Sequence, residues 1–323
     1  MDELLLRDLI IRRIPGTNSR EQILLYKTFD KEEGLSIFFK EAVEGILGRK
    51  LSQVSVSIED LREQAEKDIR TMEIRGIGCV SFVSSQYPPL LRELYDPPAL
   101  IFYRGILPNP EQPLAAVVGT RRPTAAAASQ AYDIGKALAD AGIPVVSGLA
   151  LGIDAMAHRG NLEGGAPTVA VLGSSPDEVY PGANRVLARR IMDRGGVILS
   201  EYPPGTGPRK WNFPARNRII SGLARGTVIV EAPASSGALI TARFALEQGR
   251  DLWVTSSGVN SVRGEGTRKL AEEGARVIFE AAELLGEWGI VVENTSEKTG
   301  FRDRPLPGAM LASSLARKLN IDL

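Results

Sequence analysis

The sequence of 323 residues contains one cysteine, Cys79, and one histidine, His158. A single cysteine excludes an intramolecular disulfide framework and a metal site built from several thiolates. A single histidine excludes every mechanism and every metal site that needs two. We therefore expect neither a metal nor another cofactor.

Long apolar segments and an excess of charge of one sign are also absent. No stretch approaches the roughly 20 apolar residues of a transmembrane helix. The start, Met1-Asp2-Glu3, lacks the basic residues of a signal peptide. Lysine plus arginine number 39, as do aspartate plus glutamate. These features predict a cytoplasmic protein without a membrane partner, in which any affinity for a polyanion depends on local charge.

Two phosphate-binding motifs are missing as well. No G-x-G-x-x-G follows the first predicted strand of the main domain, and no G-x-x-x-x-G-K-S/T occurs. The first absence argues against the usual dinucleotide site, and the second argues against a P-loop ATPase.

The chain divides into four predicted parts. Residues 1–78 have apolar positions three and four apart, a spacing typical of helices, and predict a small all-helical domain. Residues 79–113 are punctuated by prolines and predict an irregular joint packed on the edge of the next domain. Residues 114–286 form the predicted main domain, and residues 287–323 are a short tail.

Short apolar runs alternate with helical segments through the main domain. Continuous runs of Val, Ile and Leu indicate strands that are covered on both faces, as in a parallel sheet. Their alternation with helices predicts a doubly wound α/β fold. The runs are Leu114 to Val118, Ile143 to Val146, Thr168 to Leu172, Val197 to Leu199, Thr227 to Val230, Leu252 to Thr255 and Arg276 to Phe279.

Glycine-rich turns with hydroxyl side chains follow four of these strands. In an open α/β sheet, ligands bind beyond the carboxyl ends of the strands. Glycine lets the backbone approach a ligand, and helix N-termini favour anions. One such turn merely connects a strand to a helix, but four at one sheet edge predict an anion-binding edge. The turns contain Gly119-Thr120-Arg121-Arg122, Ser147-Gly148, Ser235-Ser236-Gly237 and Ser256-Ser257-Gly258.

Basic residues gather in a segment without acidic ones, from Tyr202 to Val230. A second acid-free segment, Gln112 to Tyr132, contains two arginines. Cations bind phosphates and aromatic side chains stack on unpaired bases, which is the combination that single-strand binding uses. A solvated basic loop beside two core aromatics is the alternative. The first segment contains Arg209, Lys210, Trp211, Phe213, Arg216, Asn217, Arg218 and Arg225.

Few residues are candidates for catalysis. Asp154 and His158 are four residues apart and can share one helical face, but without further ligands we expect a structural histidine with Asp154 as its partner. Glu201 and Glu231 lie at or just after strand ends and are candidate general bases, although such carboxylates more often brace a loop. A nucleotide or ribosyl hydrolase that uses Glu231 as acid/base is the alternative to a DNA-binding protein.

Several long motifs resemble those of the DNA-processing protein A family (DprA, also called Smf). The segment from Ser147 to His158 is similar to the family signature S-G-x-A-x-G-I-D-x-x-A-H. The similar region spans Gly76 to Leu285, with the motifs in family order. Further matching segments are Tyr87-Pro88-Pro89-Leu90, Phe213 to Leu223, Ser236 to Ala242 and Glu247 to Arg250.

The resemblance implies an extended Rossmann-like, mostly parallel sheet that binds single-stranded DNA without catalysing a reaction. It also implies a role in natural transformation, in which the protein protects incoming strands and helps to load the recombinase RecA. Family members typically form homodimers, and the apolar stretch Ala271 to Trp288 is a candidate contact. The expected DNA-binding residues are Gly119, Thr120, Arg121, Ser147, Gly148, Lys210, Phe213, Arg216, Asn217, Arg218, Ser236 and Gly237.

The sequence departs from the family pattern at two turns. Gly266-Thr267-Arg268 stands where the family commonly has Gly-Thr-Asn, and Ser256-Ser257-Gly258 stands where Val-Pro-Gly is usual. Both departures place local contacts at these turns in question. The residues after Glu287 are also too few for the winged-helix domain that many relatives carry.

Overall fold

The structure is a computed structural model that describes residues 3–29, 39–51 and 57–290. Within these described ranges, four helices precede the first strand: α1 (Glu3–Arg12), α2 (Ser19–Thr28), α3 (Phe39–Leu47) and α4 (Ile58–Arg75). Capping boxes at Asn18 and Ser57 start α2 and α4, because each side chain accepts a hydrogen bond from a first-turn amide that the helix cannot satisfy. The described residues of this part confirm the predicted helical region.

The described part of the chain forms one sheet of nine strands in the order β1-β2-β6-β5-β4-β3-β7-β8-β9. Pairing from β6 to β9 is parallel, whereas β1 and β2 are antiparallel to their neighbours. The mostly parallel α/β fold is therefore confirmed. The strands are β1 (Gly78–Ser81), β2 (Leu100–Gly105), β3 (Ala115–Val118), β4 (Val145–Ser147), β5 (Val169–Val171), β6 (Val197–Ser200), β7 (Gly226–Ile229), β8 (Asp251–Thr255) and β9 (Arg276–Ile278).

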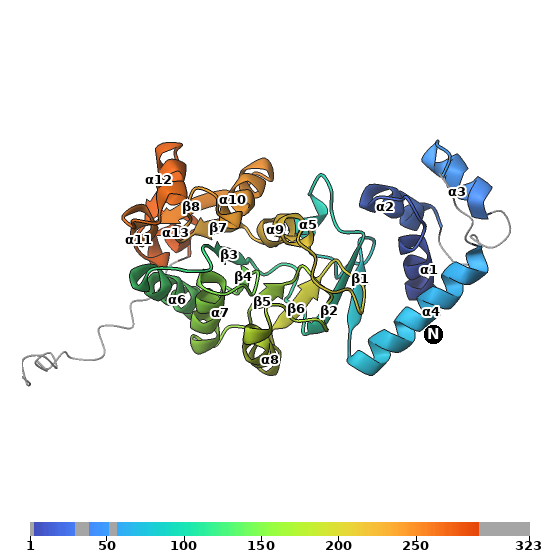
Figure 1. The fold of residues 1–323 in the computed structure, drawn as a ribbon, viewed down its shortest axis with the longest axis horizontal. Helices are drawn as coiled ribbons and strands as arrows, with labels where there is room; N and C mark the ends of the chain where they lie inside the picture. The colour runs from blue at the N-terminus through green and yellow to red at the C-terminus, as the bar shows by residue number, and fades with distance from the viewer. Residues whose placement is uncertain (1–2, 30–38, 52–56, 291–323) are drawn as a thin grey trace, which may run out of the picture.

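The irregular joint predicted for residues 79–113 is wrong in one respect, because this segment supplies most of β1 and all of β2. Prolines 88, 97 and 98 fall in the connection between these strands and not within them. Phe102 of β2 belongs to the same buried cluster as the apolar side chains of α1, α2 and α4. The helical region therefore packs against the edge of the sheet (Figure 1).

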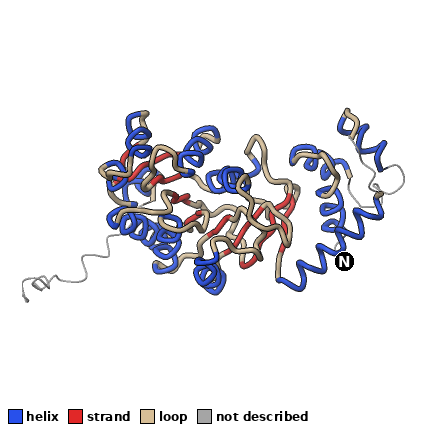
Figure 2. The backbone as a smooth tube through the Cα atoms, in the orientation of Figure 1, coloured by secondary structure: helices blue, strands red, loops and turns tan. Residues whose placement is uncertain are grey.

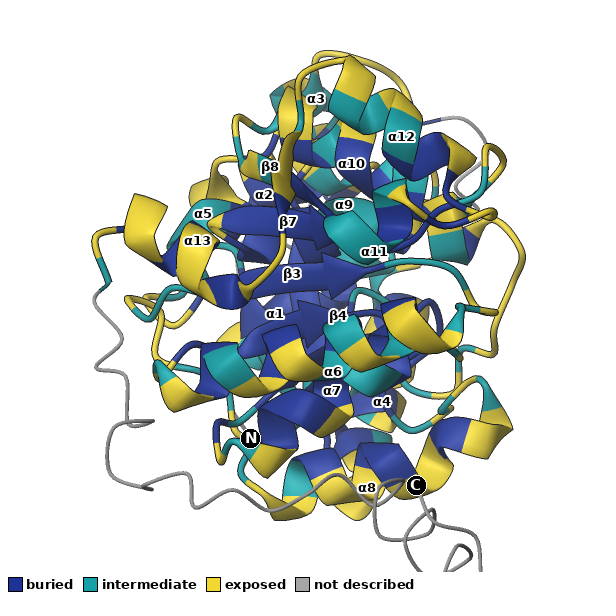
Figure 3. Ribbon diagram, turned by 90° about the vertical axis from the view of Figure 1, so that its left-hand side faces the viewer, coloured by how far each residue is buried: buried dark blue, intermediate teal, exposed yellow. Residues whose placement is uncertain are grey.

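Helices cover both faces of the main sheet (Figure 2). Side chains alternate along β3, so that Ala116 and Val118 pack with α9 and α10, while Ala115 and Val117 pack with α6 and α7. Figure 3 shows the buried inner and exposed outer faces of α6. The helices are α5 (Pro89–Arg92), α6 (Ala125–Asp140), α7 (Ile153–Glu163), α8 (Arg185–Asp193), α9 (Asn212–Leu223), α10 (Gly237–Glu247), α11 (Ser256–Val259), α12 (Glu265–Glu272) and α13 (Ala281–Glu287), with a short 3-10 turn at Gly182–Asn184.

The chain reverses its direction of travel across the sheet at β3. From β3 it proceeds through β4 and β5 to β6 on one side, and then crosses over to β7 on the other side. The connections that leave β3 and β7 therefore diverge, which opens a crevice at the carboxyl ends of these strands. No helix among the described residues is both long and apolar enough to cross a membrane.

Candidate nucleic-acid interface

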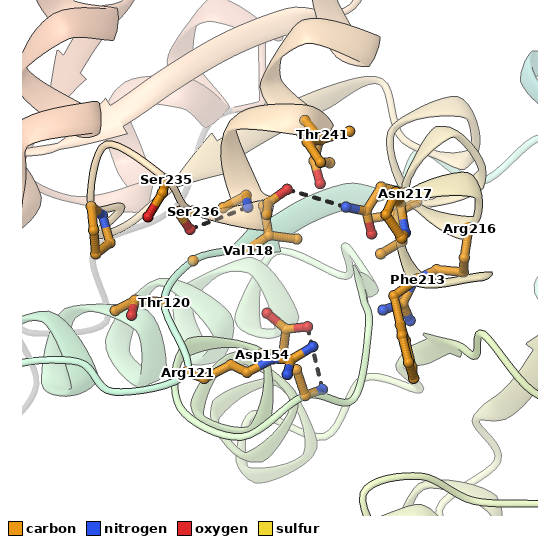
Figure 4. Close-up of a pocket in the computed structure, with 18 of the residues that line it drawn as sticks. Val118, Thr120, Arg121, Asp154, Phe213, Arg216, Asn217, Ser235, Ser236 and Thr241 are labelled. Atoms are coloured by element: carbon orange, nitrogen blue, oxygen red, sulfur yellow. Dashed lines mark hydrogen bonds between the residues drawn. The ribbon is translucent and has the colours of Figure 1, made fainter. Parts of the chain in front are cut away.

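An open pocket of about 840 Å³ lies at this crevice. Three segments form most of its wall: the turn after β3, the start of α10, and the first half of α9 with the residue Lys210 before it. Figure 4 shows side chains from these three segments around the pocket. The pocket therefore lies at the crevice between the carboxyl ends of β3 and β7, where the strand order favours ligand binding.

The turn after β3 is held close to the neighbouring loops. A Cβ on Gly119 would lie 2.7 Å from the side chain of Ile153 and 2.9 Å from the carbonyl oxygen of Glu231, so only glycine fits. The Thr120 amide donates a 2.7 Å hydrogen bond to the same Glu231 oxygen. Arg121 follows on the exposed rim, where its side chain lines the pocket.

Two aromatic rings form one side of the pocket. The ring centroids of Phe213 and Tyr180 are 5.4 Å apart, and the guanidinium of Arg121 lies 5.9 Å from the centroid of Phe213. A Cβ on Gly173 would lie 2.9 Å from the Phe213 ring, so the ring rests directly on that backbone. Tyr180 is 44% exposed. An aromatic surface with a cation beside it is therefore open to a ligand.

Arg216 lines the pocket, but its side chain is buried. Its Nη1 donates hydrogen bonds to the carbonyl oxygens of Gly148, at 2.9 Å, and of Val171. Burial is the main influence on its pKa, which falls to about 10 although Asp154 acts in the opposite direction. Arg216 is therefore still charged at neutral pH, and its positive charge lies beneath the pocket.

The start of α10 closes the opposite wall. The Ser236 side chain accepts a 3.2 Å hydrogen bond from the Ala238 amide, and Asn217 of α9 donates a 3.2 Å bond to the Gly237 carbonyl (Figure 4). These bonds fix the N-terminus of an 11-residue helix at the pocket. The partial positive charge of such a terminus favours an anion.

Residues 78–289 match the family described as DNA recombination-mediator protein A. The chain belongs to this family. It is 36% identical to the DNA processing protein DprA of Bacillus subtilis over 241 residues, which cover 74% of this chain and 80% of the relative. It is 43% identical to the protein Smf of Synechocystis over 209 residues, which cover 64% of this chain. The match spans 52%, about half, of the Synechocystis protein.

Solved structures of the family share the fold. The crystal structure of DprA from Streptococcus pneumoniae aligns with a TM-score of 0.72 and 32% identity, covering 88% of this chain and 97% of that one. A structure of the Helicobacter pylori protein, described as showing its single-stranded DNA binding mode, aligns with a TM-score of 0.58 and 31% identity. That alignment covers 66% of this chain and 95% of the Helicobacter chain.

The pocket brings together most of the residues that the sequence predicts to bind DNA. Gly148 lines a smaller adjoining cavity of about 70 Å³. Ser147 is buried beneath the sheet edge, where its hydroxyl donates to the Val117 carbonyl at 2.7 Å. The predicted residues that line the main pocket are Gly119, Thr120, Arg121, Lys210, Phe213, Arg216, Asn217, Ser236 and Gly237.

Arg218 does not line the pocket. Its Nη2 lies 2.7 Å from a Glu201 carboxylate oxygen, and its Nε lies 3.6 Å from Asp96. These two carboxylates come from distant parts of the chain, so the acid-free surroundings of Arg218 in the sequence gave no sign of them. Trp211 is 67% exposed but also stays outside the pocket lining. A direct DNA contact by Arg218 has no support from this geometry and stays a prediction.

Sequence reasoning missed several residues of the pocket. Tyr180 lies in the loop between β5 and α8, several residues after the end of the strand. The sequence predicted ligand contacts only in turns that directly follow a strand, and Tyr180 is not in such a turn. An aromatic residue next to a proline in an otherwise polar loop was the available signal. Arg263 was also missed, whereas Arg122 belongs to the predicted turn after the first strand of the main domain; both line the pocket and are exposed. They are further basic side chains at its rim.

The predicted fourth turn, Ser256-Ser257-Gly258, is not at the pocket. It forms α11, and the Ser257 amide donates a 3.0 Å bond to Gln130 of α6. Arg268, the other departure from the family pattern, donates bonds of 2.6 and 3.2 Å to the Ser261 and Val259 carbonyls. Both departures therefore lie in local packing away from the pocket.

Neither candidate general base faces the pocket. The side chain of Glu231 is fully buried, and its carboxylate accepts hydrogen bonds from the Thr124 amide, at 2.8 Å, and from the Ser261 hydroxyl. It joins the start of α6 to the loop that follows α11. Glu201 accepts from Arg218 instead. Both carboxylates brace loops, and the hydrolase alternative gains no acid/base group from them.

His158 is buried, but its partner is not Asp154 as the sequence suggested. The Thr168 hydroxyl donates to the Val145 carbonyl at 2.7 Å, so the His158 Nδ1–H donates to that hydroxyl, also at 2.7 Å. Asp154 accepts the Gly148 and Ala150 amides, at 3.0 and 3.3 Å, because the tight loop after β4 turns these amides toward it. Burial is the main reason that the pKa of His158 falls to about 3.

Proposed function

We propose that this protein binds single-stranded DNA in the pocket at the β3–β7 crevice, without chemical turnover, in the cytoplasm. It protects the strand and helps to load RecA during DNA recombination or natural transformation, and it acts as a homodimer. Support comes from the family, whose described members include DNA processing proteins, and from the pocket itself.

One arrangement carries the proposal: exposed cations line the same pocket as an aromatic pair, the exposed Tyr180 and the half-buried Phe213. Arg121 and Lys210 are both exposed at the pocket. In the described part of the chain, neither pairs with a carboxylate. The rings of Phe213 and Tyr180 pack on each other in the same pocket, and the Arg121 guanidinium lies 5.9 Å from the centroid of Phe213. Phosphates bind the cations and unpaired bases stack on the rings, a surface that suits single strands of any sequence.

Duplex DNA fits this arrangement less well. The bases of a duplex are stacked on each other and cannot reach Phe213 without unpairing. The backbone contacts alone remain available to it. We therefore expect a clear preference for single strands together with little preference among base sequences.

The proposal is tested by titrating the purified protein into a labelled oligo-dT and, in parallel, incubating it with mononucleotides. The expected result is tight, salt-sensitive binding of the oligonucleotide with no released base or sugar phosphate. Released product identifies a hydrolase and overturns the proposal, as does a protein that binds neither oligo-dT nor a mixed-sequence strand.

The RecA role needs its own experiment. RecA hydrolyses ATP when it assembles on a single strand, and a strand already covered by single-strand-binding protein delays that assembly. Addition of this protein is expected to shorten the delay. A delay that is unchanged at saturating protein removes RecA loading from the proposal and leaves strand binding in place.

A further inference from the structure

Helix α8 carries an unusual concentration of positive charge. Three exposed arginines lie on its outer face and a fourth follows at the C-cap, and only one acidic residue, Asp193, occurs in the helix. The inner face, formed by Leu187, Ala188 and Ile191, is buried against β5 and β6, and Figure 1 shows the helix beneath these strands. The exposed arginines are Arg185, Arg189, Arg190 and Arg194.

These arginines differ from several other cations on the helix surfaces of the protein. On other helices, Lys136 pairs with Asp140 and Lys269 with Glu273, each with a carboxylate four residues away. In the part of the chain that the structure describes, no arginine of the α8 face pairs with a carboxylate. Arg189 is four residues before Asp193 and still does not pair with it. The charge on α8 is therefore available to a ligand.

The arrangement is also unfavourable for the helix itself. Arg185 and Arg189 are four residues apart, and like charges at this spacing destabilise a helix. Arg185 is the first residue of α8, where a cation opposes the helix dipole. Arginines that destabilise their own helix have a physical reason to be there if they bind an anion.

The α8 face adjoins the DNA pocket through the aromatic side. Tyr180 and Pro181 line the smaller cavity next to Phe213, and the turn Gly182–Asn184 joins them directly to α8. The Asn184 side chain fixes this turn by donating to the Leu149 and Ala150 carbonyls, at 2.9 and 3.1 Å.

The first arginine of α8 folds back toward that junction. A Cβ built on Gly182 would lie 3.9 Å from the guanidinium carbon of Arg185. Arg189 follows one helical turn later, about 6 Å further along the axis. Cations and rings therefore form a path from the pocket onto the helix, in the order Arg121, Phe213, Tyr180, Arg185 and Arg189.

We propose that the α8 face is a second phosphate-binding surface, which holds the backbone of a single strand that leaves the pocket past Tyr180. This inference rests on the proposed function, because it extends the same site. The ligand is the phosphate backbone of a strand longer than the pocket can hold. Bases need not be read there, since the face presents guanidinium groups and one exposed aliphatic side chain, Val186.

The test compares two lengths of labelled oligo-dT, of about 6 and about 20 nucleotides, which span the usual site sizes of single-strand-binding folds. The variant is Arg185→Gln/Arg189→Gln. The matched control is Arg70→Gln/Lys269→Gln, which removes two charges from exposed helix positions that pair locally with Glu66 and Glu273.

We expect the α8 variant to bind the short strand as the parent does and the long strand on the order of 10-fold more weakly at about 0.1 M salt. Its log-log salt slope on the long strand should be smaller by about 1.4, or about 0.7 for each lost phosphate contact. Its thermal unfolding midpoint should be unchanged or raised, since a charge conflict is removed. The control should match the parent in all three measurements.

Three results overturn the inference: parent-like affinity and slope for the long strand, equal weakening for both lengths, or the same loss in the control. The proposed function fails separately, when the parent binds neither length or when Arg121→Ala/Phe213→Ala binds both lengths as the parent does.

Discussion

Arg216 and Asp154 meet at Gly148, beneath the pocket. A Cβ placed on Gly148 would lie 2.6 Å from the Arg216 guanidinium and 2.7 Å from the Asp154 carboxylate. The carboxylate compensates the buried guanidinium, which in turn holds the loop after β4 through the Gly148 carbonyl. This buried pair supports the floor on which the exposed cations and rings are arranged.

Replacement of Arg216 should therefore cost stability before it costs affinity. Removal of one member of a buried charge pair typically destabilises by about 3–5 kcal/mol. We expect Arg216→Met to lower the free energy of unfolding by about 3 kcal/mol near neutral pH, measured by denaturant titration. A loss below about 1 kcal/mol contradicts a supporting role for the pair.

The same variant should respond to pH in a defined direction. Burial raises the pKa of Asp154, and Arg216 opposes that rise. Without Arg216 the pKa rises further, so the folded variant holds the proton more tightly than the unfolded chain does. Its stability is then greatest below the ordinary carboxyl pKa and is lost as pH rises through the raised value. The loss caused by Arg216→Met should thus be smaller near pH 4 than near pH 7.

Two glycines of the predicted site provide a matched comparison. A Cβ on Gly148 meets both charged side chains, whereas a Cβ on Gly237 meets nothing within 4 Å. Gly148→Ala should destabilise by about 1–3 kcal/mol, as overpacking does, and should weaken DNA binding. Gly237→Ala, at the first turn of α10, should retain stability. If denaturant titrations give the two variants the same free energy of unfolding within error, the packing described at Gly148 is contradicted.

His158 should be a structural residue. Its pKa of about 3 in the fold lies below the ordinary value of 6.5, so the stability contributed by the neutral ring is present above pH 6.5 and is lost as pH falls toward 3. The parent should lose up to about 1.4 kcal/mol per pH unit in that window from this group. His158→Asn should lack this dependence, melt at a lower temperature and keep its DNA affinity. Unchanged melting with lost binding identifies a ligand contact instead.

The homodimer remains a prediction. Half of the apolar side chains of Ala271 to Trp288, among them Leu284 and Leu285, are buried in the protein's own core, but Phe279 stays 67% exposed beside the edge strand β9. An exposed ring beside a strand at the edge of the described sheet suits a self-association surface. Sedimentation at micromolar protein without DNA should give a dimer, and Phe279→Asp should shift it toward monomer. A monomeric parent contradicts the prediction.

Much of the fold was accessible from sequence, because strands buried on both faces leave continuous apolar runs. All seven strands of the main domain lie within or next to such runs. Strand β2, Leu100–Gly105, was missed although it is apolar. The prolines at 97 and 98, just before it, led to its assignment to the irregular joint. Its pairing with β6 is antiparallel and depends on contacts distant in sequence.

The site was predictable to the extent that it follows strand ends and helix starts. Gly119 and Arg121, and Ser236 at the start of α10, lie where the topology places them. Arg218 shows the limit, because the carboxylates that engage it, Glu201 and Asp96, come from other segments. The sequence shows where the cations are along the chain, but tertiary packing decides which carboxylates they pair with.

The central claim is that exposed cations at the β3–β7 crevice hold the phosphates of a single strand. Arg121→Ala/Lys210→Ala tests it most directly, because both side chains line the pocket and are exposed, unlike Arg216. Fluorescence anisotropy titrations at several salt concentrations should compare this variant with the parent and with Arg70→Ala/Lys269→Ala.

We predict that the log-log salt slope on oligo-dT falls by about 1.4 in the pocket variant, or about 0.7 per phosphate. Binding should weaken alike across base sequences, with the control unchanged and duplex bound less well than single strand by the parent. An affinity and slope equal to those of the parent would contradict the account.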